Sequence, residues 1–127
     1  MKVKNIELFN FINSELGNKR LPAKLSLAIS VNVEEAGKKI EIYEKERIKI
    51  AEAHAKKDEN GEPVIENSKY VIEDPVAWRK EHQELVNAEV ECAMTTVTID
   101  DITKCDEPGF DSLTVNEMTV IRFMIEK

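Results

Sequence analysis

The chain has 127 residues, of which 42% are hydrophobic and 34% charged, with a formal net charge of −7. This length and composition suit one helix-rich domain and exclude a disordered chain, and the acidic balance argues against direct binding of nucleic acid. No apolar run approaches the roughly 20 residues of a membrane helix, and no secretory leader is apparent, so we expect a cytoplasmic protein without membrane contacts.

The first expected elements are short. Residues 1–4 alternate in polarity as a strand does, and a helix is predicted to follow from Asn5 to about Leu16. The apolar residues of this segment lie at helical spacing, and Gly17 is expected to end the helix.

A long helix is predicted from about residue 22 to residue 57, with Pro22 in its first turn. Apolar residues recur within it at alternating steps of four and three: Ile29, Val33, Ala36, Ile40, Tyr43, Arg47, Ile50 and His54. This heptad stripe needs a partner along most of its length, because its apolar side chains would otherwise stay in water. The partner is either another segment of this chain or a second copy of it.

The chain is expected to turn back after the long helix. Two short β-favouring runs around a polar turn predict a β-hairpin tip at about residues 60–73. Asp74 followed by Pro75 predicts the start of a return helix that runs to about residue 90. Antiparallel pairing of the two helices would place Trp78 beside His54 and cover the distal half of the heptad stripe.

The last third of the chain is predicted to form the base of the structure. A β-branched run over residues 90–99 favours a strand, which would pair with residues 1–4 and 123–125. A loop should follow, and a capping box of Thr114 and Glu117 predicts a C-terminal helix at about residues 115–123. We therefore predict a mostly helical α+β fold in a single domain, residues 1–127. A long antiparallel helical hairpin, or arm, carries the β-hairpin tip, with a small sheet and short helices at its base.

Searches for catalytic motifs give almost nothing. The sequence lacks the phosphate-binding, HExxH and GxSxG patterns, so we predict no enzymatic activity and no cofactor. His54 and His82 lack further ligands at the spacing of a structural zinc site, so no metal site is expected. Cys92 and Cys105 are expected to remain thiols.

Charge is divided unevenly along the chain. Residues 1–57 hold 12 Lys/Arg and 8 Asp/Glu, whereas residues 58–127 hold 6 and 17. The halves can complement each other, or the second can offer an acidic surface to a basic partner. The candidate interaction residues are acidic and aromatic side chains of this half: Asp100, Asp101, Asp106, Glu107, Asp111, Trp78 and Tyr70.

Two residues of the helical hairpin have alternative interpretations. Trp78 is either a core residue against His54 or an exposed anchor of the kind that interfaces favour. Arg47, at a stripe position, either extends to solvent, pairs with Glu89 across the helices or fixes the register of the pairing.

Several short segments together resemble a family of small uncharacterised phage and prophage proteins of Gram-positive hosts. The segments span most of the chain: Leu21-Pro22-Ala23-Lys24, Lys57-Asp58-Glu59-Asn60-Gly61, Glu73-Asp74-Pro75, Glu84-Leu85, Glu89-Val90-Glu91 and Phe123-Met124-Ile125-Glu126. The resemblance implies a viral protein made in the cytoplasm of a bacterial host. It carries over no activity, cofactor or catalytic residue.

Two hypotheses of function follow. In the first, the protein binds and modulates a host protein of defence or replication, using its acidic surface or the arm tip. In the second, it is an assembly component that forms a homodimer through the heptad stripe, with these contact residues: Ile29, Val33, Ala36, Ile40, Tyr43 and Arg47. The segment that covers residues 29–40 decides how much of the stripe remains for a second copy.

Overall fold

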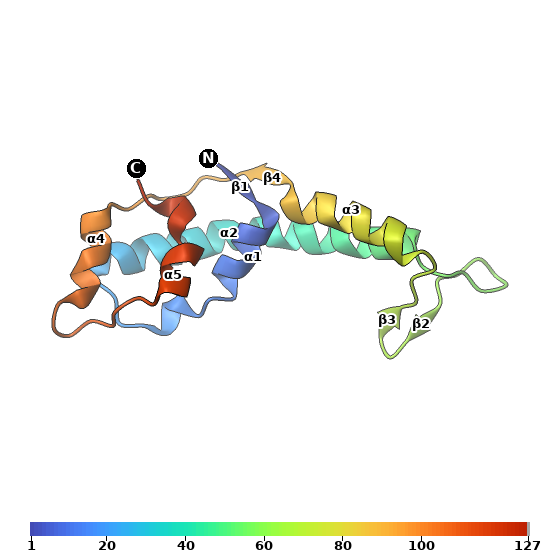
Figure 1. Cartoon of the computed structure of the whole chain (residues 1–127), viewed down its shortest axis with the longest axis horizontal. Coiled ribbons are helices and arrows are strands. Elements are labelled where there is room, and N and C mark those ends of the chain that lie inside the picture. Colours follow the sequence, from blue (N-terminus) through green and yellow to red (C-terminus); the bar gives the residue numbers. More distant parts are fainter. Residues whose placement is uncertain (127) are drawn as a thin grey trace. The chain divides into compact units, whose positions relative to one another are not determined.

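A computed structural model describes residues 1–126, which are mostly helical and include two small antiparallel sheets (Figure 1). The chain divides into two compact units, and the expected single domain is thus subdivided. Unit 1 comprises Met1–Ile40 and Glu89–Lys127, and unit 2 comprises Glu41–Ala88. The long helix α2, Ala23–Ala53, contributes residues to both units. The predicted α+β, mostly helical fold is confirmed.

The sheet of unit 1 joins the start of the chain to its last third. Strand β1, Lys2–Lys4, pairs antiparallel with β4, Glu89–Glu91, in a register that places Lys4 opposite Glu89 and Val3 opposite Val90. Val3 is buried, and the lysines of β1 face the glutamates of β4 across the pair. Opposite charges in directly facing positions favour this register over a shifted one.

The first helix, α1, spans Asn5–Ile12 and is shorter than expected. Asn5 is its first residue and is buried, while the preceding lysine occupies the cap position. Glu15 has a left-handed φ of 59°, and a 3-10 turn, η1, follows at Leu16–Asn18. Leu16 therefore reaches the core from this turn and not from the helix.

The core of unit 1 covers the first part of the heptad stripe. Ile29 and Ala36 of α2 are 2% and 0% exposed. They belong to one cluster with buried side chains of α1, η1 and the last third of the chain: Leu8, Phe11, Leu16, Cys92, Val97, Cys105, Ile121 and Met124. The chain itself thus supplies the partner for these stripe positions.

The expected strand at residues 90–99 is wrong beyond Glu91. A side chain of α2 holds the following residues: Asn32 Nδ2 donates to the carbonyl of Thr95 (2.8 Å), and Asn32 Oδ1 accepts from the Thr95 N–H (2.7 Å). Val97 then forms a parallel bridge with Ile125, which is one pair of the pairing expected between this segment and residues 123–125. Asn32, which is fully buried, thus replaces a neighbouring strand for this segment.

Helix α4, Ile99–Thr103, lies where a strand end and a loop were expected. The Thr98 hydroxyl accepts from the Asp101 N–H (3.2 Å), and the Asp101 carboxylate accepts from the Thr98 N–H (2.9 Å). This capping box outweighs the β-branched character of Thr98 and Ile99. A 3-10 turn, η2, extends the helix over Lys104–Asp106.

Helix α5, Val115–Val120, begins at the predicted capping box, and the 3-10 turn η3, Arg122–Met124, follows it. Glu117 Oε1 accepts from the Thr114 N–H (2.9 Å) and forms an ion pair with Lys19 (2.7 Å). Burial alone would raise the pKa of Glu117, but its bonds to Lys19 and Thr114 outweigh burial and hold that pKa below its usual value.

In unit 2, α2 ends at Ala53, four residues before the predicted end near residue 57. The chain leaves the helix because Ala55 and Lys57 form antiparallel bridges with Ile72 and Pro63. The predicted β-hairpin is present as β2, Ile65–Glu66, and β3, Lys69–Tyr70. Its two central residues, Asn67 and Ser68, have φ of 52° and 64°. Positive φ at both positions is typical of the tight turns whose twist matches that of the strands.

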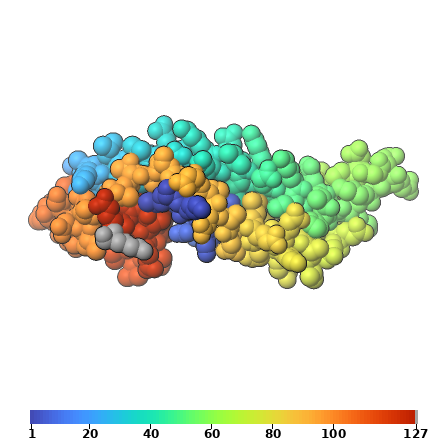
Figure 2. All heavy atoms as spheres, turned by 90° about the horizontal axis from the view of Figure 1, so that it is seen from above, coloured from blue at the N-terminus to red at the C-terminus, as the bar shows by residue number. Residues whose placement is uncertain are grey.

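The return helix α3 spans Pro75–Asn87. Asp74 caps it as predicted, with Oδ1 accepting from the N–H groups of Val76 and Ala77, each at 3.2 Å. The helix ends before residue 90 because Glu89 already belongs to β4. Within unit 2, α3 runs antiparallel along the second part of α2, so the predicted helical hairpin forms (Figure 1, Figure 2).

Candidate functional site

A pocket of about 620 Å³ opens in unit 2 between the helical hairpin and the β-hairpin, and we call it the hairpin pocket. Its lining comes from α2, from the β-hairpin with the residues after it, and from α3: Arg47, Ile48, Ala51, Ser68, Lys69, Tyr70, Ile72 and Trp78. Ligand pockets usually enclose about 300–1,000 Å³, so this one has room for a small molecule or a few residues of a peptide.

Contacts at the end of α2 set the position of α3. The Glu73 N–H donates to the carbonyl of His54 (2.9 Å), and His54 Nε2 lies 2.7 Å from Glu81 Oε2. The sequence predicted that His54 would lie beside Trp78, whereas its hydrogen bond goes to Glu81, about one helical turn further along α3. Trp78 instead lines the hairpin pocket.

Trp78 has a buried hydrogen-bond donor without an acceptor. Its indole ring stacks on His82, with centroids 5.0 Å apart and planes at 19°. The indole N–H is shielded from solvent, and no residue in the range 1–126 accepts its hydrogen bond. Leaving a buried polar group unpaired costs about 1–3 kcal/mol. This N–H is closed to a ligand as it is to water, so Trp78 offers the hairpin pocket its ring and not a hydrogen bond.

Some polar and charged side chains around the pocket form hydrogen bonds or ion pairs within the chain, and Lys69 does not form an ion pair. Arg47 donates from Nε and Nη2 to Glu44 Oε2, at 3.0 and 2.8 Å. The Tyr70 hydroxyl donates to Glu52 Oε1 (2.7 Å), and this bond raises the pKa of Tyr70 above its ordinary value. Lys69 forms no ion pair within the described part of the chain. The neighbouring carboxylates are thus occupied, while the lining itself contains two cationic residues and no acidic one.

The structure brings together three residues that the sequence singled out separately, namely Trp78, Tyr70 and Arg47. Sequence analysis missed the other lining residues. Of these, Ile48 could have been found in the sequence, because it is an apolar residue of the long helix that lies outside the heptad stripe. In the structure its side chain is 43% exposed. Lys69 and Ser68 carried none, because their place in the lining depends on how the β-hairpin folds.

The predicted acidic residues lie in unit 1, in α4, in η2 and in the loop that leads to α5. Asp101 is 5% exposed, because it caps α4 and pairs with Lys24 at 3.2 Å. Asp106 accepts from the Ser112 hydroxyl (2.9 Å), and Asp111 accepts from the Arg20 N–H (2.7 Å). Three of the five carboxylates therefore hold unit 1 together.

The other two acidic candidates, Asp100 and Glu107, are exposed. Neither side chain has a hydrogen bond or ion pair with another residue of the range 1–126. They remain as surface charges, but they are too few to make an extended acidic face.

Asp101 predicts a pH dependence of stability. Hydrogen bonds from Thr98, the backbone bond first, and the neighbouring Lys24 hold the pKa of Asp101 below its usual value. A carboxyl with a lowered folded-state pKa stabilises the fold above its unfolded pKa, and that contribution is lost as pH falls through the folded pKa. We expect Asp101→Asn to lower the melting temperature at neutral pH, with a penalty that shrinks below a pH of about 4.

Thermal melts followed by circular dichroism over this pH range measure that penalty. Asp100→Asn is the matched control, because Asp100 is the exposed neighbour and should cost little at any pH. A penalty for Asp101→Asn that stays the same from neutral pH to acid would contradict the assignment.

The predicted oligomer contacts are largely used within the chain. Ile29, Ala36 and Tyr43 are buried, with Tyr43 8% exposed in unit 2. Ile40 is partly buried against the core of unit 1. Arg47 pairs with Glu44 on its own helix, not with Glu89. Among these stripe positions only Val33, at 39%, keeps a substantially exposed apolar side chain.

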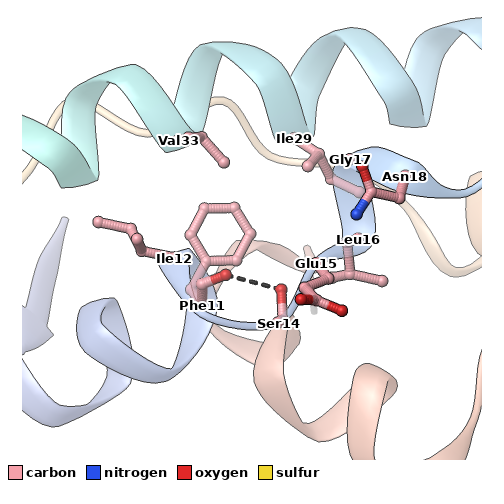
Figure 3. Close-up of a pocket in the computed structure, with 9 residues that line it drawn as sticks. All are labelled: Phe11, Ile12, Ser14, Glu15, Leu16, Gly17, Asn18, Ile29 and Val33. Atoms are coloured by element: carbon pink, nitrogen blue, oxygen red, sulfur yellow. Dashed lines mark hydrogen bonds between the residues drawn. The ribbon is translucent and has the colours of Figure 1, made fainter.

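A smaller pocket of about 190 Å³ lies next to Val33 in unit 1 (Figure 3). Phe11 points from α1 toward α2, from which Ile29 and Val33 point back, and η1 closes one side. The Ser14 hydroxyl donates to the carbonyl of Phe11 (2.6 Å) within this wall. Apart from Glu15, the lining has no charged group, so the pocket gives little information about a ligand.

The cysteines and histidines were the other candidates for chemistry. Cys92 and Cys105 are free and buried, and burial raises the pKa of both thiols. In residues 1–126 no group of three or more His, Cys, Asp or Glu side chains is placed to hold a metal ion. Because the thiolate is the reactive form of cysteine, the raised pKa of both thiols makes them poor nucleophiles.

Within the described residues, no helix has the length and apolar character needed to cross a bilayer. No protein-family model, curated protein or solved structure matches the chain. The functional interpretation therefore depends on the geometry of the hairpin pocket and on the sequence.

Proposed function

We propose that this protein is a non-enzymatic binding module that recognises another protein through the hairpin pocket. One observation carries the proposal: a pocket of about 620 Å³, large enough for a protein segment, is lined by large side chains from α2, the β-hairpin and α3. Tryptophan, tyrosine and arginine are the residues that most often dominate binding energy in interfaces. Trp78, Tyr70 and Arg47 all line this pocket.

The resemblance to small phage proteins supports a cellular setting for this binding. In our proposal the protein acts in the cytoplasm of a bacterial host, where it modulates a host protein of defence or replication. The chain's surface acidity would then influence which partners approach, since long-range electrostatics affect the rate of encounter. The pocket would supply the specific contact.

The hairpin pocket is a better contact surface than the acidic segment of unit 1. Asp101, Asp106 and Asp111 are engaged in hydrogen bonds that hold unit 1 together, so contact with a partner would have to compete with those bonds. In the hairpin pocket, Ile48 is apolar and 43% exposed and Lys69 has no ion pair in residues 1–126, so a partner can contact both without breaking a bond. Homodimerisation through the heptad stripe has less support, because the chain already buries Ile29 and Ala36.

Site-specific photo-crosslinking tests the proposal. A benzophenone amino acid is placed at Glu66, which lies opposite Lys69 in the β-hairpin and outside the pocket lining, or at Glu107, in the acidic segment, and each protein is expressed in a Gram-positive host and irradiated. We expect one defined host protein to crosslink from position 66 and not from position 107. The crosslinked protein is then purified, and its dissociation constant is measured by calorimetry.

Variants of α3 make the test specific. Trp78→Ala should weaken the purified complex by about tenfold or more, as expected for a central interface tryptophan. Val76→Ala is the matched control, because Val76 lies on the same helix, is 76% exposed and does not line the pocket. Crosslinking only from position 107, or equal affinities for wild type and Trp78→Ala, would overturn the proposal.

A further inference from the structure

The charge of the hairpin pocket differs from that of its surroundings. Unit 2, Glu41–Ala88, contains 12 Asp/Glu against 8 Lys/Arg, and the whole chain is acidic. The pocket lining nevertheless contains Arg47 and Lys69 and no carboxylate. Arg47 already donates from two of its nitrogens to Glu44, whereas Lys69 has no ion-pair partner in residues 1–126. Two carboxylates bind lining residues directly, Glu44 at Arg47 and Glu52 at Tyr70, so the unpaired positive charge of the lining in residues 1–126 is that of Lys69.

The remaining lining is apolar and aromatic. Ile48, Ala51 and Ile72 contribute aliphatic surface, and Trp78 and Tyr70 contribute rings. Ile48 is 43% exposed, so part of this apolar surface faces water when the pocket is empty. An apolar side chain that covered it would remove this surface from water, which favours binding.

These features together specify a ligand. We infer that the hairpin pocket binds a short acidic peptide segment with one large aliphatic side chain, an inference that rests on the proposed function. The aliphatic side chain packs against Ile48 and Ile72, and a flanking carboxylate pairs with Lys69. The ring of Trp78, which also lines the pocket, adds to this contact surface.

Charge complementarity separates this ligand from nucleic acid. Recognition of a phosphate backbone draws on many clustered basic residues, because each neutralised phosphate adds to the affinity. The pocket has one cation without an ion pair in residues 1–126, Lys69, in a unit with more acidic than basic residues. A carboxylate of a peptide matches that single charge, and an extended polyanion does not.

The chain contains a built-in reporter for the test. Trp78 is its only tryptophan, so intrinsic fluorescence reports directly on the pocket. Three synthetic peptides without tryptophan or tyrosine are titrated into the full-length protein: a leucine flanked by aspartates, and the same peptide with asparagines or with lysines in place of the aspartates. We expect the aspartate peptide to bind about tenfold more tightly than the asparagine peptide, and the lysine peptide to bind weakest.

Salt and one charge reversal complete the test. The preference for aspartate should shrink at about 1 M salt, where the screening length falls to roughly 3 Å. Lys69→Glu should abolish the preference for aspartate or reverse it. Lys80→Glu, on the exposed surface of α3 and outside the pocket lining, is the matched control and should leave the order of the peptides unchanged. Circular dichroism checks that both variants fold.

Each other outcome overturns the inference. Equal affinities for the aspartate and asparagine peptides, or no change in Trp78 emission with any peptide, would rule out an acidic aliphatic ligand. Self-association that Lys69→Glu abolishes would assign the pocket to a second copy of this chain. A host protein that crosslinks from position 66 while the peptides fail would leave the proposed function standing, so the two failures are distinguishable.

Discussion

Replacement of Asn32 by leucine is expected to lower the free energy of unfolding by about 2–3 kcal/mol. Asn32 is fully buried, and its amide makes two short hydrogen bonds with the main chain of Thr95. Leucine keeps the approximate size of the side chain but removes both bonds, so the Thr95 N–H and carbonyl lose their protein partners. The segment after β4 should then detach from α2 before the rest of unit 1 unfolds.

Chemical denaturation followed by circular dichroism measures the loss, and amide hydrogen exchange at Thr95 locates it. Asn10→Leu is the matched control, because Asn10 is an exposed residue of α1 and should change stability by no more than about 0.5 kcal/mol. Unchanged exchange protection at Thr95 in Asn32→Leu would show that another contact holds the segment.

Phe11→Ala is expected to have the larger effect, about 3–5 kcal/mol. Phe11 is 1% exposed at the centre of the unit 1 cluster, and its ring meets Phe123 edge to face at 5.2 Å. Truncation removes that contact and leaves a void. Since Phe11 also lines the smaller pocket, the void would join an existing opening (Figure 3).

Urea unfolding of the wild type and the variant measures this loss. Leu27→Ala on α2 is the control, because Leu27 is 66% exposed and its truncation should cost less than about 0.5 kcal/mol. A loss for Phe11→Ala no larger than that of the control would mean that the cluster around Phe11 contributes little to stability.

The elements that could be predicted from the sequence are those set by short-range chemistry. Asp74 and Pro75 start α3, and Thr114 with Glu117 starts α5, because each cap involves residues within one helical turn. The strand predicted over residues 90–99 was wrong beyond Glu91 for two reasons: Asn32 of α2 binds the main chain of Thr95, and the capping box of Thr98 starts a helix where the strand was expected to end. That capping box could have been predicted from the sequence, since Asp101 is the third residue after Thr98.

The part of the site that could not be predicted depends on contacts between distant residues. Trp78, Tyr70 and Arg47 were recognisable by type, but their common pocket depends on the register of α3 against α2. The hydrogen bond of His54 to Glu81 could not be predicted either, because the two residues lie 27 apart in the sequence. Asn32 was missed for the same reason, because its partner Thr95 lies 63 residues away.

The division into two units also sets the order in which the chain can acquire structure. Unit 2 is a single continuous segment, Glu41–Ala88, whereas unit 1 is assembled from segments on either side of it. In the small sheet of unit 1, Lys2 pairs with Glu91, so this pairing closes a loop that contains the whole of unit 2. Pairings of such long separation are slow, because the chain loses entropy before the contacts compensate for it. During synthesis on the ribosome, the helical hairpin can therefore form before β4, the partner of β1, has been synthesised.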